Sequence, residues 1–160
     1  NLQSLMAGQT TTRLAELGID LPEPSAPAAN YVPYVVSGNL VFVSGQLPVW
    51  NGDFRFIGKV GADFSLEEGI EAARLCGINL IAQARDAAGG DLDRIKRVVK
   101  LGGFVNAGPD FTDHPKVING ASDLMADVFG EAGKHARFAV GAVSLPLGVA
   151  VEVDGVFELG

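Results

Sequence analysis

The sequence predicts an α+β protein in which two helices pack on one face of a mixed β-sheet. Apolar runs rich in β-branched residues alternate with amphipathic segments in the order strands, helix, strand, helix, two strands. A capping motif opens the first long amphipathic segment. Hydrophobic residues make up 48% of the 160 residues and charged residues 19%, which is typical of a single folded domain.

The N-terminal part contains little strand signal. Residues 1–5 precede Met6 and have the character of an expression-tag remnant, so we assign residues 1–12 to a tag remnant and a flexible N-terminus. Residues 13–160 are assigned to one domain. A short helix is expected around TTRLAELGI (11–19), and the Pro- and Ala-rich segment 20–33 is expected to be extended.

Two tight turns organise the first strands. The runs YVVSG (34–38) and NLVFVSGQL (39–47) meet at Gly38-Asn39 and are typical of a β-hairpin. Asn51-Gly52 is a strong hairpin signal and predicts a second, smaller turn.

Two helices and three further strands follow. Ser65 and Glu68 form a capping box, and apolar residues at helical spacing predict a helix over 66–88 that ends at Gly89-Gly90. A strand is predicted over 97–107 and a second helix over 117–133. The last two strands are predicted to flank the Leu-Pro-Leu-Gly turn at 145–148 as neighbours.

The strands are apolar on nearly every residue, as in LVFVSG (40–45) and VAVEV (149–153). Two helices cannot cover both faces of such a sheet, so we expect a homo-oligomer that buries the second face. Gly102 and Gly103 in the middle strand are expected either to allow close packing or to open space for a larger ligand.

Composition and charge exclude several functions. The net charge of −7 argues against a broad grip on nucleic-acid phosphates. No apolar run is long enough for a membrane span, so a cytoplasmic protein is expected. Cys76 is expected to be a buried core thiol, while His114 and His135 are expected to be surface or capping residues. Their spacing predicts no metal site, and we expect no cofactor.

Common catalytic motifs are missing, which leaves two charges in the apolar C-terminal stretch as candidates. Arg137 presents a planar fork that binds carboxylates, and Glu152 is a possible base for activating water. From the residues alone, these side chains are equally consistent with exposed strand charges or a structural ion pair.

Three segments resemble the YjgF/YER057c/UK114 family, also called the Rid family of reactive-intermediate deaminases. They are VSGNLVFVSGQLPV (36–49), VVKLGGFVNAGPDF (98–111) and HARFAVGAVSLPLGVAVEVDGV (135–156), and the resemblance spans residues 28–158. It implies a chorismate-mutase-like fold and a homotrimer with ligand sites in the clefts between subunits.

The resemblance also implies an activity. Deaminases of this family hydrolyse 2-imino acids or enamines to 2-oxo acids and ammonia without a cofactor. The family's essential arginine corresponds to Arg137, which would hold the substrate carboxylate, and its glutamate corresponds to Glu152, which would orient the attacking water. The family's pocket tyrosine corresponds to Tyr31, and its pocket-lining Ser-Gly pair corresponds to Ser44 and Gly45.

The chain departs from the family pattern beside the arginine. Phe138 and Ala139 stand where Ser and Cys are common, and Ser144 replaces a frequent Arg. The family's pocket asparagine corresponds to Asn119 or to no residue here, because the preceding loop is longer. These changes keep two alternatives open: a non-catalytic trimeric module that binds a small carboxylate or another metabolite, and a ribonuclease or translation inhibitor, against which the acidic charge counts.

Overall fold

The protein is built on one five-stranded mixed sheet. The structure is a computed structural model that describes residues 8–27 and 29–160. The strands run in the order β1-β2-β7-β5-β6, and only β5 and β6 are parallel to each other. They are β1 (Tyr34–Ser37), β2 (Leu40–Gln46), β5 (Ile95–Asn106), β6 (Ala136–Ala142) and β7 (Val151–Leu159).

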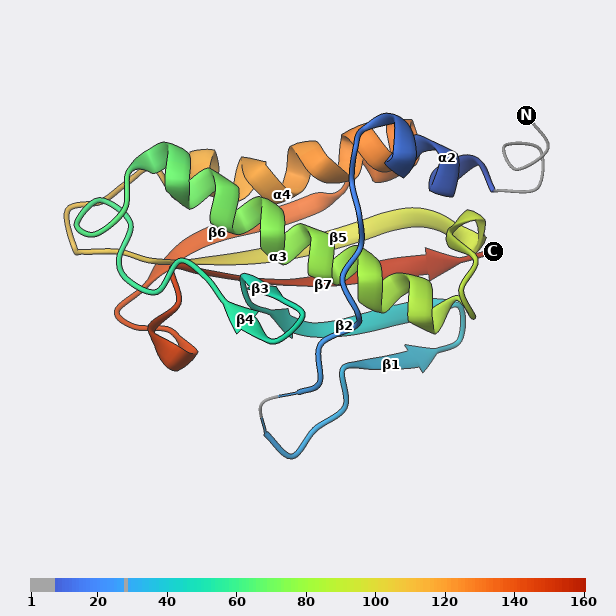
Figure 1. The fold of residues 1–160 in the computed structure, drawn as a ribbon, viewed down its shortest axis with the longest axis horizontal. Coiled ribbons are helices and arrows are strands. Elements are labelled where there is room, and N and C mark those ends of the chain that lie inside the picture. The colour runs from blue at the N-terminus through green and yellow to red at the C-terminus, as the bar shows by residue number, and fades with distance from the viewer. Residues whose placement is uncertain (1–7, 28) are drawn as a thin grey trace.

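Helices α3 (Leu66–Ala87) and α4 (His114–Phe129) lie on the same face of this sheet (Figure 1). A third helix, α2 (Gln9–Glu16), packs beside α4, where the Arg13 Nε–H donates to the Asp127 carbonyl at 2.9 Å. The predicted α+β class with a mixed sheet and two helices on one face is therefore confirmed, and α2 is an additional layer element beside them.

Local signals in the sequence located several elements well. The Gly38-Asn39 hairpin joins β1 and β2, and Asn51-Gly52 joins β3 (Val49–Trp50) and β4 (Asp53–Phe54). The Ser65 capping box is formed in both directions: the Glu68 amide donates to Ser65 Oγ at 3.2 Å, and the Ser65 amide donates to Glu68 Oε1 at 3.0 Å. These devices work through residues close in sequence, which is why the sequence alone shows them.

The prediction that the last two strands are neighbours was wrong. Strand β5 lies between β6 and β7, so β6 forms the sheet edge in parallel with β5 while β7 is central. The turn itself contains a short 3-10 helix, η3 (Pro146–Gly148), in which Leu147 has φ +58°. In this arrangement the apolar strand β7 hydrogen-bonds on both sides, which satisfies its buried backbone groups.

Two helix limits also differ from the prediction. Helix α4 spans His114–Phe129 rather than 117–133, because Pro115 is tolerated in a first helical turn and Gly130, with φ +63°, ends the helix.

The predicted division between a flexible N-terminus and the domain, at residue 13, falls inside helix α2. The Asp93 carboxylate accepts hydrogen bonds from the Gln9 and Thr10 amides, a contact across more than 80 residues that no local pattern reveals. The assignment of residues 1–5 to a tag lies outside the described residues.

The core lies between the sheet and the two long helices. Its largest fully buried side chains include Leu80 and Ile81 of α3, Leu101 of β5, Ile118 of α4 and Phe157 of β7. The glycines of β5 serve close packing rather than open space. A Cβ on Gly103 would lie 2.6 Å from Ile118, and a Cβ on Gly102 would meet Asp154 and Phe138.

The opposite face of the sheet carries apolar side chains without a covering layer in the single chain. Val35 of β1, Phe42 of β2 and Val140 of β6 are 51%, 46% and 43% exposed. This matches the sequence expectation of an apolar second face.

Within the described residues, no helix has the combination of length and apolarity that a bilayer span requires.

Candidate functional site

Arg137 lies on the edge strand β6 and points to the side of the sheet on which α4 lies. One of its terminal nitrogens, Nη1, donates to Asn119 Oδ1 at 2.8 Å and to Ser122 Oγ at 3.2 Å, and Nη2 donates to the Pro115 carbonyl at 3.3 Å. All three acceptors are neutral. No carboxylate of residues 8–27 or 29–160 forms an ion pair with Arg137. The guanidinium is thus oriented by the protein while its charge and its remaining N–H groups are available to an anion.

A chain of hydrogen bonds through His135 and Ser122 helps to fix this orientation of Arg137. The imidazole of His135 contacts the Gly133 carbonyl through Nδ1 at 2.6 Å and Ser122 Oγ through Nε2 at 2.8 Å. A carbonyl can only accept, so Nδ1 carries a hydrogen, and in the neutral ring Nε2 accepts from the Ser122 hydroxyl. The lone pairs of Ser122 then accept from Arg137. We call Arg137, Asn119, Ser122 and His135 the arginine group.

Glu152 occupies a different environment on the central strand β7. Its side chain is half-buried, and burial, followed by the nearby charge of Asp154, raises the pKa of Glu152 above its ordinary value. Burial also raises the pKa of Asp154, against the lowering effects of a Gly102 backbone hydrogen bond and of Lys100. A carboxyl with a raised pKa is a better proton acceptor when ionised, which suits a general base.

The Ser-Gly pair of β2 lies beside this carboxyl. A Cβ on Gly45 would come within 2.9 Å of Glu152 Cδ, so only glycine permits this approach. The Ser44 hydroxyl donates to the Val32 carbonyl at 2.8 Å, which fixes the segment that carries Tyr31. Tyr31, Ser44 and Gly45 all line one cavity of about 510 Å³. We call Tyr31, Ser44, Gly45 and Glu152 the glutamate group.

The two groups lie on opposite faces of the sheet within one chain. Paired residues on neighbouring strands share a face, and successive residues alternate between faces. Arg137 pairs with Leu101 of β5, which is buried under the helices. Glu152 pairs with Phe104, three residues further along β5 and hence on the other face. A single chain therefore does not bring Arg137 and Glu152 together, and they are not an internal ion pair.

Two of the residues that depart from the family pattern, Phe138 and Ala139, are also separated. Ala139 pairs with Gly103 and packs against the core on the helical face, the same face as Arg137. Phe138 lies on the other face, where its ring meets Phe104 edge-on with centroids 5.4 Å apart and lies 5.6 Å from Lys100 Nζ. Phe138 therefore does not enter the surroundings of Arg137 in its own chain.

Of the site residues proposed from the sequence, the structure thus places Asn119 against Arg137. It places Tyr31, Ser44 and Gly45 along one cavity, and Gly45 lies beside Glu152. Sequence reasoning missed Ser122, whose spacing of three residues from Asn119 puts both on one side of α4. Cys76 is fully buried, as expected, and donates to the Val151 carbonyl at 3.5 Å.

The described residues hold no group of three or more His, Cys, Asp or Glu side chains arranged to bind a metal ion. The chemistry available at these two groups is that of a fixed cation, a carboxylate of raised basicity, hydroxyls and backbone amides.

Comparisons with known proteins show to which family this chain belongs. Residues 11–158 match the family described as "YjgF/chorismate mutase-like, putative endoribonuclease". Protein TCP17 of Trypanosoma cruzi is 52% identical over 154 residues, which cover 96% of both chains. The RutC family protein y4sK of Sinorhizobium fredii is 34% identical over 122 residues, covering 76% of this chain and 81% of that protein.

Solved structures with a similar fold and sequence support the same family. A protein of unknown function from Agrobacterium tumefaciens superposes with a TM-score of 0.88 at 49% identity, covering 94% of this chain and 92% of the other. A "putative endoribonuclease" from Shewanella oneidensis superposes with a TM-score of 0.91 at 39% identity, covering 95% of this chain and all of the other. With nearly the whole length matched in sequence and in fold, this chain belongs to the YjgF/chorismate mutase-like family, which includes the Rid proteins.

Proposed function

We propose that this protein is a cofactor-independent hydrolase that converts 2-imino acids and their enamine tautomers to 2-oxo acids and ammonia. The site would lie in clefts between the subunits of a homotrimer. The observation that carries the proposal is the state of Arg137: its guanidinium is held by three neutral acceptors and retains its charge and free N–H groups for an anion. A substrate carboxylate fits this requirement.

The reaction needs one activated water. Glu152 accepts a proton from water as the water oxygen bonds to C2 of the imine, and the electrons of the C=N bond move to nitrogen, which takes up a proton from solvent. The protonated Glu152 carboxyl then gives its proton to the amine nitrogen of the resulting carbinolamine. The Glu152 carboxylate takes the hydroxyl proton as the C=O bond forms and the C2–N bond breaks, ammonia leaves, and Glu152 returns its proton to solvent. An enamine must first be protonated on carbon to give the imine.

The placement of the two groups supports an assembly of several chains. Arg137 and Glu152 point to opposite faces of one sheet, so a ligand that touches both requires residues of two chains. The exposed apolar side chains on the face of Glu152 supply a surface for such an interface. A closed ring of three copies would repeat the pairing of one subunit's arginine group with the next subunit's glutamate group.

A binding module without catalysis is the second candidate. Ala139 supports it, since an apolar methyl group occupies the helical face near Arg137 where the family commonly offers a thiol. Ribonuclease activity, suggested by the name of the Shewanella protein, has weaker support because the chain carries a net charge of −7. A salt-dependent affinity for RNA would favour that third reading.

The proposal is tested by measuring ammonia and 2-oxo acid released from imines that an amino-acid oxidase generates in the assay. Wild type is expected to accelerate release, and Arg137→Ala is expected to abolish the acceleration. Arg97→Ala, an exposed arginine on β5, is the matched control and should behave as wild type. If wild type gives no acceleration with small, branched or aromatic imines, yet still binds 2-oxo acids in an Arg137-dependent way, the protein is a binding module.

A further inference from the structure

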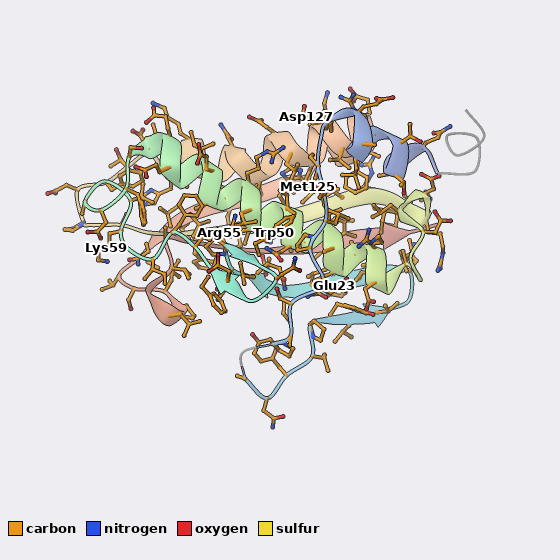
Figure 2. All side chains as sticks on the ribbon, in the orientation of Figure 1. Glu23, Trp50, Arg55, Lys59, Met125 and Asp127 are labelled. Carbon is orange, nitrogen blue, oxygen red and sulfur yellow. The ribbon has the colours of Figure 1, made fainter. Side chains whose placement is uncertain are left out.

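One cavity of the single chain extends well beyond the residues that the reaction needs. Its volume is about 510 Å³, and it lies between the segment that follows α2, the end of β2 and the β3–β4 hairpin. We call residues 23–27 the arm. Figure 2 labels Glu23 on the arm and Trp50 on the hairpin. The lining is formed by Glu23, Pro24, Ser25, Ala26, Pro27, Tyr31, Pro33, Ser44, Gly45, Gln46, Leu47, Val49, Asn51, Gly52 and Phe54.

Hydrogen bonds hold both walls of this cavity against α3. The Gln83 side chain donates to the Ser25 carbonyl at 2.8 Å, which fixes the arm. The Asn79 side chain donates to the Val49 carbonyl at 2.7 Å, which fixes the hairpin. The two walls also meet directly, since the Glu23 amide donates to Asn51 Oδ1 at 2.9 Å. The cavity is therefore preformed, which lowers the entropic cost of filling it.

The lining is mostly apolar and carries a single carboxylate. Prolines of the arm line it together with Leu47, Val49 and Phe54, and the polar groups are mainly amides and hydroxyls. Glu23 is the charged residue of the lining, and no Lys or Arg is present among the described residues that form it. Such a cavity favours an uncharged apolar group and disfavours an anionic one, because a buried carboxylate without a cation is costly.

One lining residue of the cavity lies beside the reacting end of the site. Gly45 lines the cavity, and a Cβ on Gly45 would come within 2.9 Å of Glu152 Cδ, so a ligand whose C2 lies near Glu152 is next to the wall of the cavity between the arm and the hairpin. A volume of about 510 Å³ is within the range of sites for whole small molecules. A substrate with a methyl side chain would leave most of it to water, whose share of liquid volume is about 30 Å³ per molecule.

We infer that this site is specific for imino or enamine acids with a large apolar or aromatic side chain, which the cavity between the arm and the hairpin receives. The inference rests on the proposed function for the reaction, but the cavity's preference is measurable without it. Imines derived from phenylalanine and leucine are expected to be hydrolysed with a kcat/KM at least about 10-fold higher than the imine from alanine. The imine from glutamate is expected to be the poorest substrate.

Two variants test the cavity itself. Ala26→Trp places a large side chain on an exposed position of the arm and is expected to lower kcat/KM for the phenylalanine imine at least about 10-fold while sparing the alanine imine. Phe54→Ala removes an apolar wall and should lower the preference to a smaller extent. Ala15→Trp, on the exposed side of α2, is the control for adding a tryptophan and should change neither rate.

A binding experiment separates this inference from the proposed function. Calorimetry with wild type compares the Kd values of 3-phenyl-2-oxopropanoate, 2-oxopropanoate and 2-oxopentanedioate. Tightest binding of the phenyl compound, weakened by Ala26→Trp, supports the inference even when no imine is hydrolysed. Equal or tighter binding of 2-oxopropanoate or 2-oxopentanedioate, or an Ala26→Trp effect that is the same for all three compounds, overturns it.

Discussion

The arginine group and the glutamate group differ in how each is prepared for a ligand. Arg137 sits on an edge strand among neutral acceptors, with a relay through Ser122 and His135 that sets its orientation. Glu152 sits on a central strand, half-buried beside Asp154, and burial together with that like charge raises its pKa. Among residues 8–27 and 29–160, the first group is a fixed cation without an anion, and the second is a carboxylate without a cation.

The difference indicates why neither group is a complete site. Their strands are separated by β5, and the side chains point to opposite faces. An isolated unpaired charge is costly to bury, so each group stays partly exposed in the single chain. A ligand with a carboxylate at one end and a reacting centre near it would connect the two groups across a subunit boundary.

Mixing of subunits gives the largest expected effect. Arg137→Ala removes a bidentate contact of two charged hydrogen bonds, each of about 1.5–3 kcal/mol, and Glu152→Gln removes the base, which contributes roughly 10²–10⁴-fold, so each variant is expected to lose at least about 100-fold in activity. Co-expression with two different tags allows assemblies that contain both variants to be purified. If each site takes its arginine from one subunit and its glutamate from the next, every mixed ring of three has one intact site, giving about one third of wild-type activity. Mixed trimers as inactive as the parents would place both residues of a site in one subunit.

Gly45→Ala tests the close approach within the glutamate group. The new Cβ would lie 2.9 Å from Glu152 Cδ and 3.2 Å from Oε1, so the carboxyl must move. We expect kcat to fall about 10-fold, because a small displacement of the reacting group is enough to lower the rate. Gly108→Ala is the matched control, because a Cβ there meets no atom within 4 Å. A Gly45→Ala protein with normal kcat would show that the Glu152 position is not critical.

Ser122→Ala tests the relay in the arginine group. It removes one acceptor from Arg137 and the hydroxyl that His135 Nε2 contacts. A lost hydrogen bond of about 1 kcal/mol predicts a KM about 5-fold higher with little change in kcat. Ser122→Thr keeps the hydroxyl and should restore the KM. Failure of threonine to restore it, or a fall in kcat instead, would argue for a packing effect rather than positioning.

The smallest expected effect is a shift in pH dependence. Glu152 acts when ionised, so activity should be present above its pKa and be lost as pH falls through it. Asp154→Asn removes a charge that raises this pKa and should move the acid limb of kcat/KM to lower pH. An acid limb that stays in place or moves to higher pH would exclude Glu152 as the titrating group.

The same carboxyls make a prediction about stability. Because burial raises the pKa of Glu152 and of Asp154 in the folded protein, the folded state binds protons that the unfolded chain releases. The stability that these groups contribute is complete below their unfolded pKa values and is lost as pH rises through the folded values. Urea unfolding of Glu152→Gln should therefore show a higher free energy of unfolding than wild type at pH 7 and no difference or a reversed one at pH 3.

The local elements of this protein could be predicted from short sequence patterns. The Ser65 capping box, the Gly38-Asn39 and Asn51-Gly52 turns and the apolar periodicity of the long helices depend on residues close in the chain, so the pattern alone located them. Its motifs also led to the family and to Arg137 and Glu152 as the candidate charges. These inferences needed only residue identity and short spacing.

Which elements are neighbours, and which side chains share a face, depends on the packing of the whole domain. The insertion of β5 between β6 and β7, the Asp93 contact that caps α2, and the meeting of Arg137 with Ser122 all join residues distant in sequence or depend on packing. Strand order is chosen by how well apolar faces and buried backbone groups are satisfied in the whole domain, and no local signal specifies it. For that reason, the sequence named Arg137 and Glu152 together, whereas the fold places them on opposite faces of one sheet.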